Sequence, residues 1–253
     1  MRSKQSTKNR CIWRRSRHET GAAATINEVG IALAAMNPSR GLGGADTLRT
    51  EQRIRGRSSP LQSLSMRAFG RPQGVLGKLG GVIMARTNRA IAARVVELLN
   101  IQPSDRVLEV GFGPGVGIQL LAEKVTSGEV VGIDCSEEMV EQATARNAAA
   151  VECGRVELQR GSVERLPFAN ETFDKALAIN SMQIWPDPVA ALRQMQLMLK
   201  PGGTIALAFT PYSGQSKEGL TERVTAAGFT DAHMLTLGRE FYVFAVRPDG
   251  VAC

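Results

Sequence analysis

The sequence predicts a doubly wound α/β fold, in which helices cover a mostly parallel seven-stranded sheet that ends in an antiparallel hairpin strand. From residue 86 onward, short apolar runs alternate with segments of helical periodicity. A glycine-rich turn follows the first apolar run, and the last two runs meet at Gly238-Arg239 with no helix between them. Alternating strands and helices favour a parallel sheet, whereas a tight turn between strands favours an antiparallel pair.

The strands are predicted from short runs rich in apolar and β-branched residues. They are residues 107–110, 130–134, 156–158, 173–180, 204–209, 232–237 and 240–246. Parallel strands buried on both faces give continuous apolar runs of this kind.

The helices are predicted from periodicity and from end signals. The first has Ile91, Val95, Leu98 and Leu99 at helical spacing and ends at residues 100–103; the second spans residues 116–124. Ser136 is the expected N-cap of the third, with Glu137 and Glu138 in its first turn, where the helix dipole favours acids. A fourth opens at Asp187-Pro188 and is stopped by residues 200–203, and a fifth spans residues 217–227 before Gly228.

Composition places the chain among ordinary globular proteins. It has 253 residues, 43% of them hydrophobic and 22% charged, and we expect no transmembrane segment. The four cysteines show no metal-binding spacing, which predicts reduced thiols, a cytoplasmic location and no metal site; they are Cys11, Cys135, Cys153 and Cys253.

The positive charge is concentrated in the first 65 residues. They hold 12 of the 31 Lys and Arg and 4 of the 24 Asp and Glu, so they carry +8 and the remainder carries −1. Residues 1–65 are predicted to be a disordered extension, with an organelle-targeting peptide, a basic binding arm and a true start at Met66 as open interpretations. No nucleic acid is expected to bind the folded domain, residues 66–253.

Residues 66–90 precede the regular pattern and are rich in glycine. Each glycine in a helix interior costs about 1 kcal/mol relative to alanine. This segment is therefore either a flexible flap over a binding cleft or a plain N-terminal packing segment.

The turn after the first strand, in the run VLEVGFGPG at residues 107–115, is the centre of the predicted site. A dinucleotide fold requires G-x-G-x-x-G, but whether counted from Gly111 or from Gly113 the last position is not glycine. Asp134 ends the second strand, 19 residues after Gly115. A carboxylate there can accept both ribose hydroxyl protons of an adenosine.

From residue 86 to residue 247 the chain resembles the class I S-adenosylmethionine-dependent methyltransferases of the small-molecule type, such as the ubiquinone/menaquinone methyltransferases. Their fold is Rossmann-like and their cofactor is S-adenosyl-L-methionine. Five blocks carry the resemblance, in the family's order and spacing: residues 107–115, 131–134, 161–168, 173–180 and 199–203.

The resemblance implies roles for single residues. The loop against the methionine part of the cofactor would be Glu109, Gly111, Phe112, Gly113 and Gly115. The nucleoside would meet Asp134 at the ribose hydroxyls, Cys135 beside the adenine, and Ser162 and Val163 at the adenine amino edge. Asn180 would lie near the sulfonium and the acceptor.

Each assignment has a structural alternative: Glu109 and Asp134 as caps, Asn180 as a turn residue, and Cys135 as packing. The family often has aspartate at the position of Ser162, and a serine there forms a neutral hydrogen bond in place of a charge-assisted one.

The implied reaction is in-line methyl transfer to a small or lipid-like acceptor, and alignment alone can supply about 7–11 kcal/mol of the barrier. Met182, Trp185 and Tyr212 are candidates for acceptor contact, with the core as the alternative place for the first two. We name no catalytic base, because neither His18 nor His233 falls near the cofactor loop.

Two other functions stay open at this stage. One is a protein that binds S-adenosylmethionine without transferring its methyl group. The other is a nucleic-acid methyltransferase guided by the basic arm, although residues 180–183 read Asn-Ser-Met-Gln where base amino-group methyltransferases have Asn/Asp-Pro-Pro-aromatic. The sequence leaves the oligomeric state open.

Overall fold

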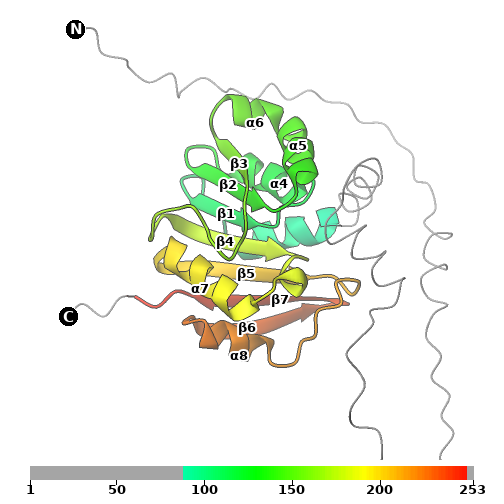
Figure 1. The fold of residues 1–253 in the computed structure, drawn as a ribbon, viewed down its shortest axis with the longest axis vertical. Coiled ribbons are helices and arrows are strands. Elements are labelled where there is room, and N and C mark those ends of the chain that lie inside the picture. The colour runs from blue at the N-terminus through cyan, green and yellow to red at the C-terminus, as the bar shows by residue number, and fades with distance from the viewer. Residues whose placement is uncertain (1–87, 250–253) are drawn as a thin grey trace, which may run out of the picture. The chain divides into compact units, whose positions relative to one another are not determined.

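The computed structural model describes residues 88–249, which form one seven-stranded sheet with the order β3-β2-β1-β4-β5-β7-β6 (Figure 1). Strands β1 to β5 pair in parallel, and β7 runs antiparallel to both β5 and β6. The predicted doubly wound, mostly parallel sheet with its antiparallel hairpin is therefore confirmed. The predictions for residues 1–87, namely the disordered extension and the covering segment up to residue 87, lie outside the described residues.

The strands are β1 (Arg106–Val110), β2 (Glu129–Asp134), β3 (Val156–Arg160), β4 (Phe173–Ile179), β5 (Leu199–Phe209), β6 (Thr230–Leu237) and β7 (Glu240–Val246). The first helix of the described residues covers residues 88–98. It is followed by α4 (Val116–Lys124), α5 (Glu137–Arg146), α6 (Ala148–Glu152), the 3-10 helix η2 (Met182–Ile184), α7 (Pro188–Met198) and α8 (Leu220–Ala226).

Two apolar cores lie on the two faces of the sheet, because successive side chains of a strand point to opposite faces. In β1, Leu108 and Val110 belong to the core that α7 and α8 cover. Val107 belongs to the other core, with the helix of residues 88–98, α4 and α5. Glu109 alternates with Leu108 and Val110, so this period of two directs its carboxyl to the face that α4 covers.

The helix starts follow the expected capping chemistry. The Ser136 hydroxyl accepts a hydrogen bond from the Met139 backbone N–H at 3.4 Å, and two glutamates occupy the first turn of α5. The Asp187 carboxylate accepts from the Ala190 N–H at 3.0 Å, directly before Pro188. These caps satisfy N–H groups that have no partner within the helix, and both predicted N-caps are confirmed.

Two boundaries differ from prediction by three residues or more, the start of α8 and the start of β5. Helix α8 begins at Leu220 and not at residue 217, because Gly219 has a left-handed φ of 67° that no α-helical residue adopts. Strand β5 begins at Leu199, so residues 200–203 lie inside the strand and not between it and α7. The buried Leu199 pairs with Phe173, and the register then shifts before Lys175, which accommodates the Pro-Gly-Gly run as an irregularity of the strand.

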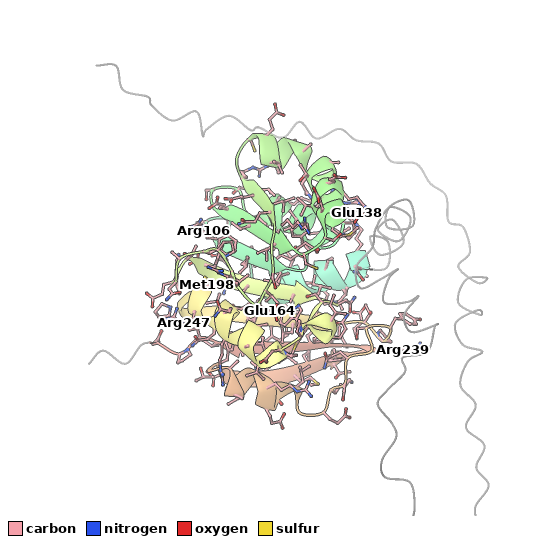
Figure 2. The ribbon with its side chains drawn as sticks, in the orientation of Figure 1. Arg106, Glu138, Glu164, Met198, Arg239 and Arg247 are labelled. Atoms are coloured by element: carbon pink, nitrogen blue, oxygen red, sulfur yellow. The ribbon has the colours of Figure 1, made fainter. Side chains whose placement is uncertain are left out.

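The carboxyl ends of the parallel strands point to one edge of the sheet. Arg106, Met198 and Arg247 mark the opposite edge, and Arg239 marks the far end of the β6–β7 hairpin (Figure 2). Ligands of open α/β sheets bind at the carboxyl edge, where the strand order reverses between β1 and β4. Within residues 88–249, no helix is both long enough and apolar enough to cross a membrane.

Candidate functional site

A cavity of about 470 Å³ opens at this edge. Its walls come from the ends of β1, β2 and β4, from the turns that follow them, and from the helix of residues 88–98. This size and position are typical of a site for a small ligand or cofactor. Of the residues expected at a cofactor site, the structure brings to its wall Glu109, Gly111, Phe112, Gly113, Asp134, Cys135, Ser162, Val163 and Asn180.

The glycine-rich turn depends on close packing at Gly111. This residue has a φ of 71°, and a Cβ built on it would lie 2.5 Å from the Cβ of Ser181. Ser181 is itself fixed, since its hydroxyl donates to the Val110 carbonyl at 3.0 Å. Only glycine fits there, so the turn after β1 stays pressed against the turn after β4.

Gly115, which the resemblance places against the cofactor, does not line the cavity. A Cβ on it would lie 2.6 Å from the Cβ of Ala143 on α5, and its carbonyl accepts from Asn147 Nδ2 at 3.1 Å. The structure therefore gives Gly115 a packing role between the loop and α5.

Asp134 holds the loop and α5 together. One carboxylate oxygen accepts from the Gly113 N–H at 2.9 Å, and the other accepts from the Ser136 N–H at 2.9 Å. Burial raises the pKa of Asp134, although these N–H groups act in the opposite direction. The Cys135 N–H acts on the same carboxylate. A carboxylate has about four lone-pair sites, so at least one is left for a further donor such as a ribose hydroxyl.

Glu109 is the most perturbed acid of the cavity. It is 2% exposed, and no described residue donates to its Oε2. Burial, and to a smaller extent the charge of Asp134, raises the pKa of Glu109 from 4.5 to about 8. A buried carboxylate with an unpartnered oxygen is costly, which makes Glu109 a candidate ligand-binding residue.

Gly117, in the first turn of α4, makes room for that carboxylate. A Cβ on Gly117 would lie 2.3 Å from Glu109 Oε1 and 2.5 Å from Oε2. The sequence alone predicts no role for Gly117 beyond its place in the helix. The clue in the sequence was the presence of a glycine inside a predicted helix. Glycine there costs about 1 kcal/mol relative to alanine and usually has a packing reason.

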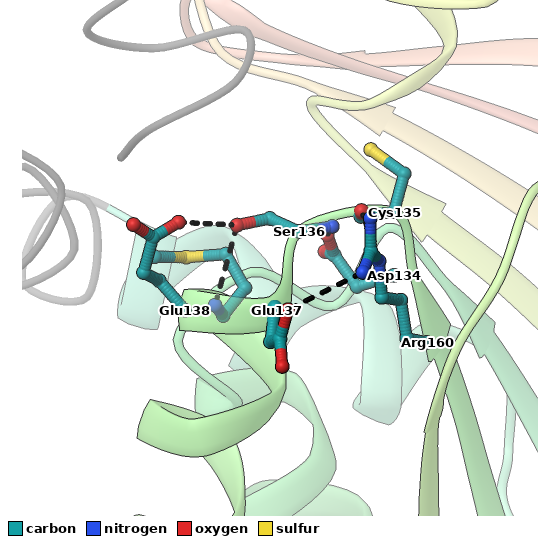
Figure 3. A network of polar contacts seen from close by, with 7 residues as sticks. Asp134, Cys135, Ser136, Glu137, Glu138 and Arg160 are labelled. Carbon is teal, nitrogen blue, oxygen red and sulfur yellow. Dashed lines mark hydrogen bonds and ion pairs between the residues drawn. The ribbon is translucent and has the colours of Figure 1, made fainter. Parts of the chain in front are cut away.

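A polar network at the start of α5 lies beside the cavity, and its members Glu137, Glu138 and Arg160 do not line the wall. Figure 3 shows Ser136 linked to Glu138, and Arg160 linked to Glu137 at 3.3 Å, beside Asp134 and Cys135. These contacts hold the start of α5, and Cys135 is exposed beside them.

Ser162 lines the cavity, but its hydroxyl is already engaged in hydrogen bonds with a neighbouring residue. Its hydroxyl accepts from the Glu164 N–H and donates to the Glu164 carboxylate, each at 3.3 Å. Val163 is 7% exposed and belongs to a core cluster while also lining the cavity. The serine therefore works first as a local turn-forming residue.

Of the three residues expected to contact the acceptor, the structure places only one at the cavity wall. Trp185 lines the cavity together with its neighbours Ile184 and Pro186. Met182 does not: it is 1% exposed and packs in the core. Tyr212 is also absent from the wall and is 76% exposed. Ile184, at the end of η2, and the two residues after it thus form one part of the apolar wall, and the structure does not bring Met182 or Tyr212 to the cavity.

The charges of the cavity are of one sign. Among the described lining residues, those with ionisable acidic side chains are Glu109, Asp134 and Glu164, and none is Lys, Arg or His. No three potential metal ligands gather anywhere in residues 88–249. A cation with hydroxyl groups, such as S-adenosylmethionine with its sulfonium and ammonium charges, fits this donor set.

Comparisons with known proteins agree with this geometry. A methyltransferase-domain model matches residues 107–203. The uncharacterized methyltransferase YdaC of Bacillus subtilis is 32% identical over 161 residues, 60% of this chain and 87% of YdaC. The ubiquinone/menaquinone biosynthesis C-methyltransferase UbiE of Geotalea daltonii is 31% identical over 130 residues, 51% of this chain and 55% of UbiE.

The fold has known counterparts as well. A crystal structure of a SAM-dependent methyltransferase from Aquifex aeolicus superposes with a TM-score of 0.56 at 21% identity, covering 61% of this chain and 88% of that one. The chain belongs to the class I S-adenosylmethionine-dependent methyltransferases, whose cofactor is S-adenosylmethionine.

Proposed function

We propose that this chain transfers a methyl group from S-adenosylmethionine to a small, apolar or lipid-like acceptor by in-line displacement. The observation that carries the proposal is the Glu109 carboxyl, which is buried at the cavity wall with an oxygen that no described residue donates to. A cationic ligand would supply the missing partner, and its charge would favour the ionised form of the acid.

The residues of the cavity divide the work between binding and orientation. Asp134 would accept from the ribose hydroxyls with the lone-pair capacity that the Gly113, Ser136 and Cys135 N–H groups leave available. Glu109 would face the positively charged end. Because Gly111 packs against Ser181, the floor between these two acids is rigid, and a rigid floor aligns the reacting groups.

The chemistry that S-adenosylmethionine supplies is a methyl group on a sulfonium, which is already activated toward nucleophiles. What remains for the protein is to exclude water and to align the acceptor. Trp185, Ile184 and Ala92 give the cavity an apolar wall, which supports an apolar acceptor. No histidine or lysine of the described cavity would serve as a base, so we expect an acceptor that is nucleophilic at neutral pH.

The first experiment is calorimetric titration of the full chain with S-adenosylmethionine and, separately, with NAD. We expect micromolar binding of the former and none of the latter, because the loop departs from the dinucleotide fingerprint. Transfer of labelled methyl to a panel of phenols, quinols and lipids then tests the acceptor class, with RNA, DNA and protein as comparison substrates. A folded chain that binds no S-adenosylmethionine, or that methylates only the comparison substrates, would refute the proposal.

A further inference from the structure

A chain of side-chain amides crosses the mouth of the cavity. Asn180, directly after β4, has a left-handed φ of 48°. Its Oδ1 accepts from the backbone N–H of Thr210 at 2.8 Å and from the Thr210 hydroxyl at 3.2 Å. Its Nδ2 donates to Oδ1 of Asn88 at 3.0 Å. These bonds join the first helix to the ends of β4 and β5 across 92 and 30 residues of sequence.

The backbone N–H of Thr210 fixes the orientation of both side-chain amides. A backbone N–H can only donate, so the group that Asn180 turns toward Thr210 must be its oxygen. Its Nδ2 then faces Asn88, and Asn88 must meet that donor with its own oxygen. The assignment of both amides follows from the obligatory donor, although oxygen and nitrogen have nearly the same shape.

The group that Asn88 has left for a ligand is therefore its N–H₂. Asn88 lines the cavity, and no residue within 88–249 accepts a hydrogen bond from its Nδ2. Asn180 also lines the cavity, but its amide oxygen and one of its two Nδ2 hydrogens are already engaged. We therefore expect Asn88, which Asn180 orients, to make the contact with the ligand that the sequence predicted for Asn180.

Few side chains of the cavity wall have a donor available for a negatively charged oxygen. Its ionisable side chains within the described residues are acidic. The Gly111 and Gly113 N–H groups donate to the Ile133 carbonyl at 2.8 Å and to Asp134 at 2.9 Å. An anionic oxygen on a ligand would therefore meet repulsion from the acids. The backbone N–H groups of Val116 and Gly117, in the first turn of α4, also line the cavity and have no partner within the helix. Asn88 offers a neutral, oriented donor.

The position of Asn88 indicates which part of the ligand it meets. Asn180 precedes Ser181, whose Cβ packs against Gly111 at the corner of the glycine turn. Asn88 hydrogen-bonds to Asn180 and so flanks this corner, whereas Asp134 ends β2 and holds Gly113. The corner is where the methionine part of the cofactor would lie, and that part carries a carboxylate.

We infer that the Asn88 amide donates from Nδ2 to the carboxylate of the methionine part of S-adenosylmethionine, with Asn180 as the positioning residue that sets the orientation of Asn88. The inference rests on the proposed function, because it assigns one contact in that cofactor site. It adds a residue of the first helix to a site otherwise built from the strand ends.

Asn88→Asp tests the contact with almost no change of shape. The variant keeps an oxygen toward Asn180 but replaces the free N–H₂ by an oxygen that repels a carboxylate. In calorimetric titrations of the full chain, we expect the affinity for S-adenosylhomocysteine to fall about ten- to hundredfold, as for a lost hydrogen bond to a charged group. Affinity for 5′-methylthioadenosine, which lacks the amino-acid part, should stay at the parent value. Asn100→Asp, at an exposed position after the same helix, is the matched control and should change neither.

Asn180→Asp tests the positioning step. An aspartate there still accepts from Thr210, but its second oxygen faces Asn88, which must turn its amide over to donate. Asn88 would then present its oxygen to the cavity, so we expect the same selective loss for S-adenosylhomocysteine with an unchanged melting temperature. A residue with a merely structural role would weaken both ligands together.

The outcomes separate clearly. If Asn88→Asp binds S-adenosylhomocysteine as tightly as the parent, or loses both ligands equally, the contact with the carboxylate is wrong even if the protein is a methyltransferase. If the folded parent binds neither ligand, the proposed function itself fails.

Discussion

Glu109 offers the sharpest test of the reasoning, because its burial has a thermodynamic consequence. Folded Glu109 keeps its proton up to a pKa of about 8, whereas in the unfolded chain it loses the proton near 4.5. Between these values the folded state binds more protons than the unfolded state, so the free energy of unfolding falls as pH rises through this window. The difference between these two pKa values corresponds to a loss on the order of 5 kcal/mol in the free energy of unfolding.

Glu109→Gln removes the titration and keeps the shape. About 3 kcal/mol of the loss lies between pH 5.5 and 8.5. Since 1 kcal/mol shifts the melting temperature of a domain of this size by about 2–4 °C, the parent should lose roughly 6–12 °C more than the variant over that interval. The constant cost of burying the glutamine amide cancels in this comparison. Glu123→Gln, exposed on α4, is the matched control and should follow the parent.

The assay is thermal unfolding of the full chain at several pH values, with and without S-adenosylmethionine. The cofactor's positive charges favour ionised Glu109, so its stabilisation of the parent should grow as pH rises toward 8, and that growth should be absent in Glu109→Gln. Parallel melting-temperature curves for parent and variant in the absence of cofactor would refute the assignment of a buried, protonated Glu109.

Two further substitutions test the walls of the same site. Gly117→Ala should lower the affinity for S-adenosylmethionine at least tenfold in calorimetry, because the added Cβ would meet the Glu109 carboxylate at 2.3 Å; an unchanged affinity would contradict the packing argument, since alanine by itself favours a helix. Asp134→Asn should destabilise the protein by about 1–3 kcal/mol in urea unfolding, because one N–H of Gly113 or Ser136 then faces an amide N–H₂ in place of an oxygen. It should also weaken cofactor binding, and a variant that bound as tightly as the parent would remove Asp134 from the site.

Local patterns in the sequence were sufficient to predict most of the fold. The bounds of α4 and the N-cap at Ser136 were predicted correctly, because an apolar period and a capping residue act within one or two turns of the chain. The start of β5 was not, because Leu199 joins the sheet through its pairing with Phe173, a contact with a distant strand. The start of α8 depends on the left-handed φ of Gly219, and glycine permits this conformation without requiring it.

The residues of the candidate site also fall into those that local sequence patterns predict and those that depend on distant contacts. Residues on the glycine turn and at the end of β2 were predicted, because a parallel strand followed by a turn places them at the carboxyl edge. Trp185 and Met182 are three positions apart in one short segment, yet only Trp185 lines the cavity. Nothing in their spacing separates them, since the irregular path of η2 decides which side chain faces inward. Asn88 was missed because its contact with Asn180 spans 92 residues.

The acids of the cavity connect stability with function. Strand pairing sets Glu109 opposite Gly132 in the neighbouring strand, and Asp134 ends that strand two residues later. The charge of Asp134 adds to the cost of ionising Glu109 in the protein without a ligand. Val107, on the same face of β1 as Glu109, is fully buried in an apolar core, so this face of the strand also accommodates an apolar side chain. A ligand that lowers the cost of ionising Glu109 is the best explanation for an acid at this position, and a cation would lower that cost. The same reasoning predicts that Glu109→Gln gains stability above pH 8 only by losing affinity for the cofactor, and a variant that gained the first without losing the second would separate the buried acid from the function.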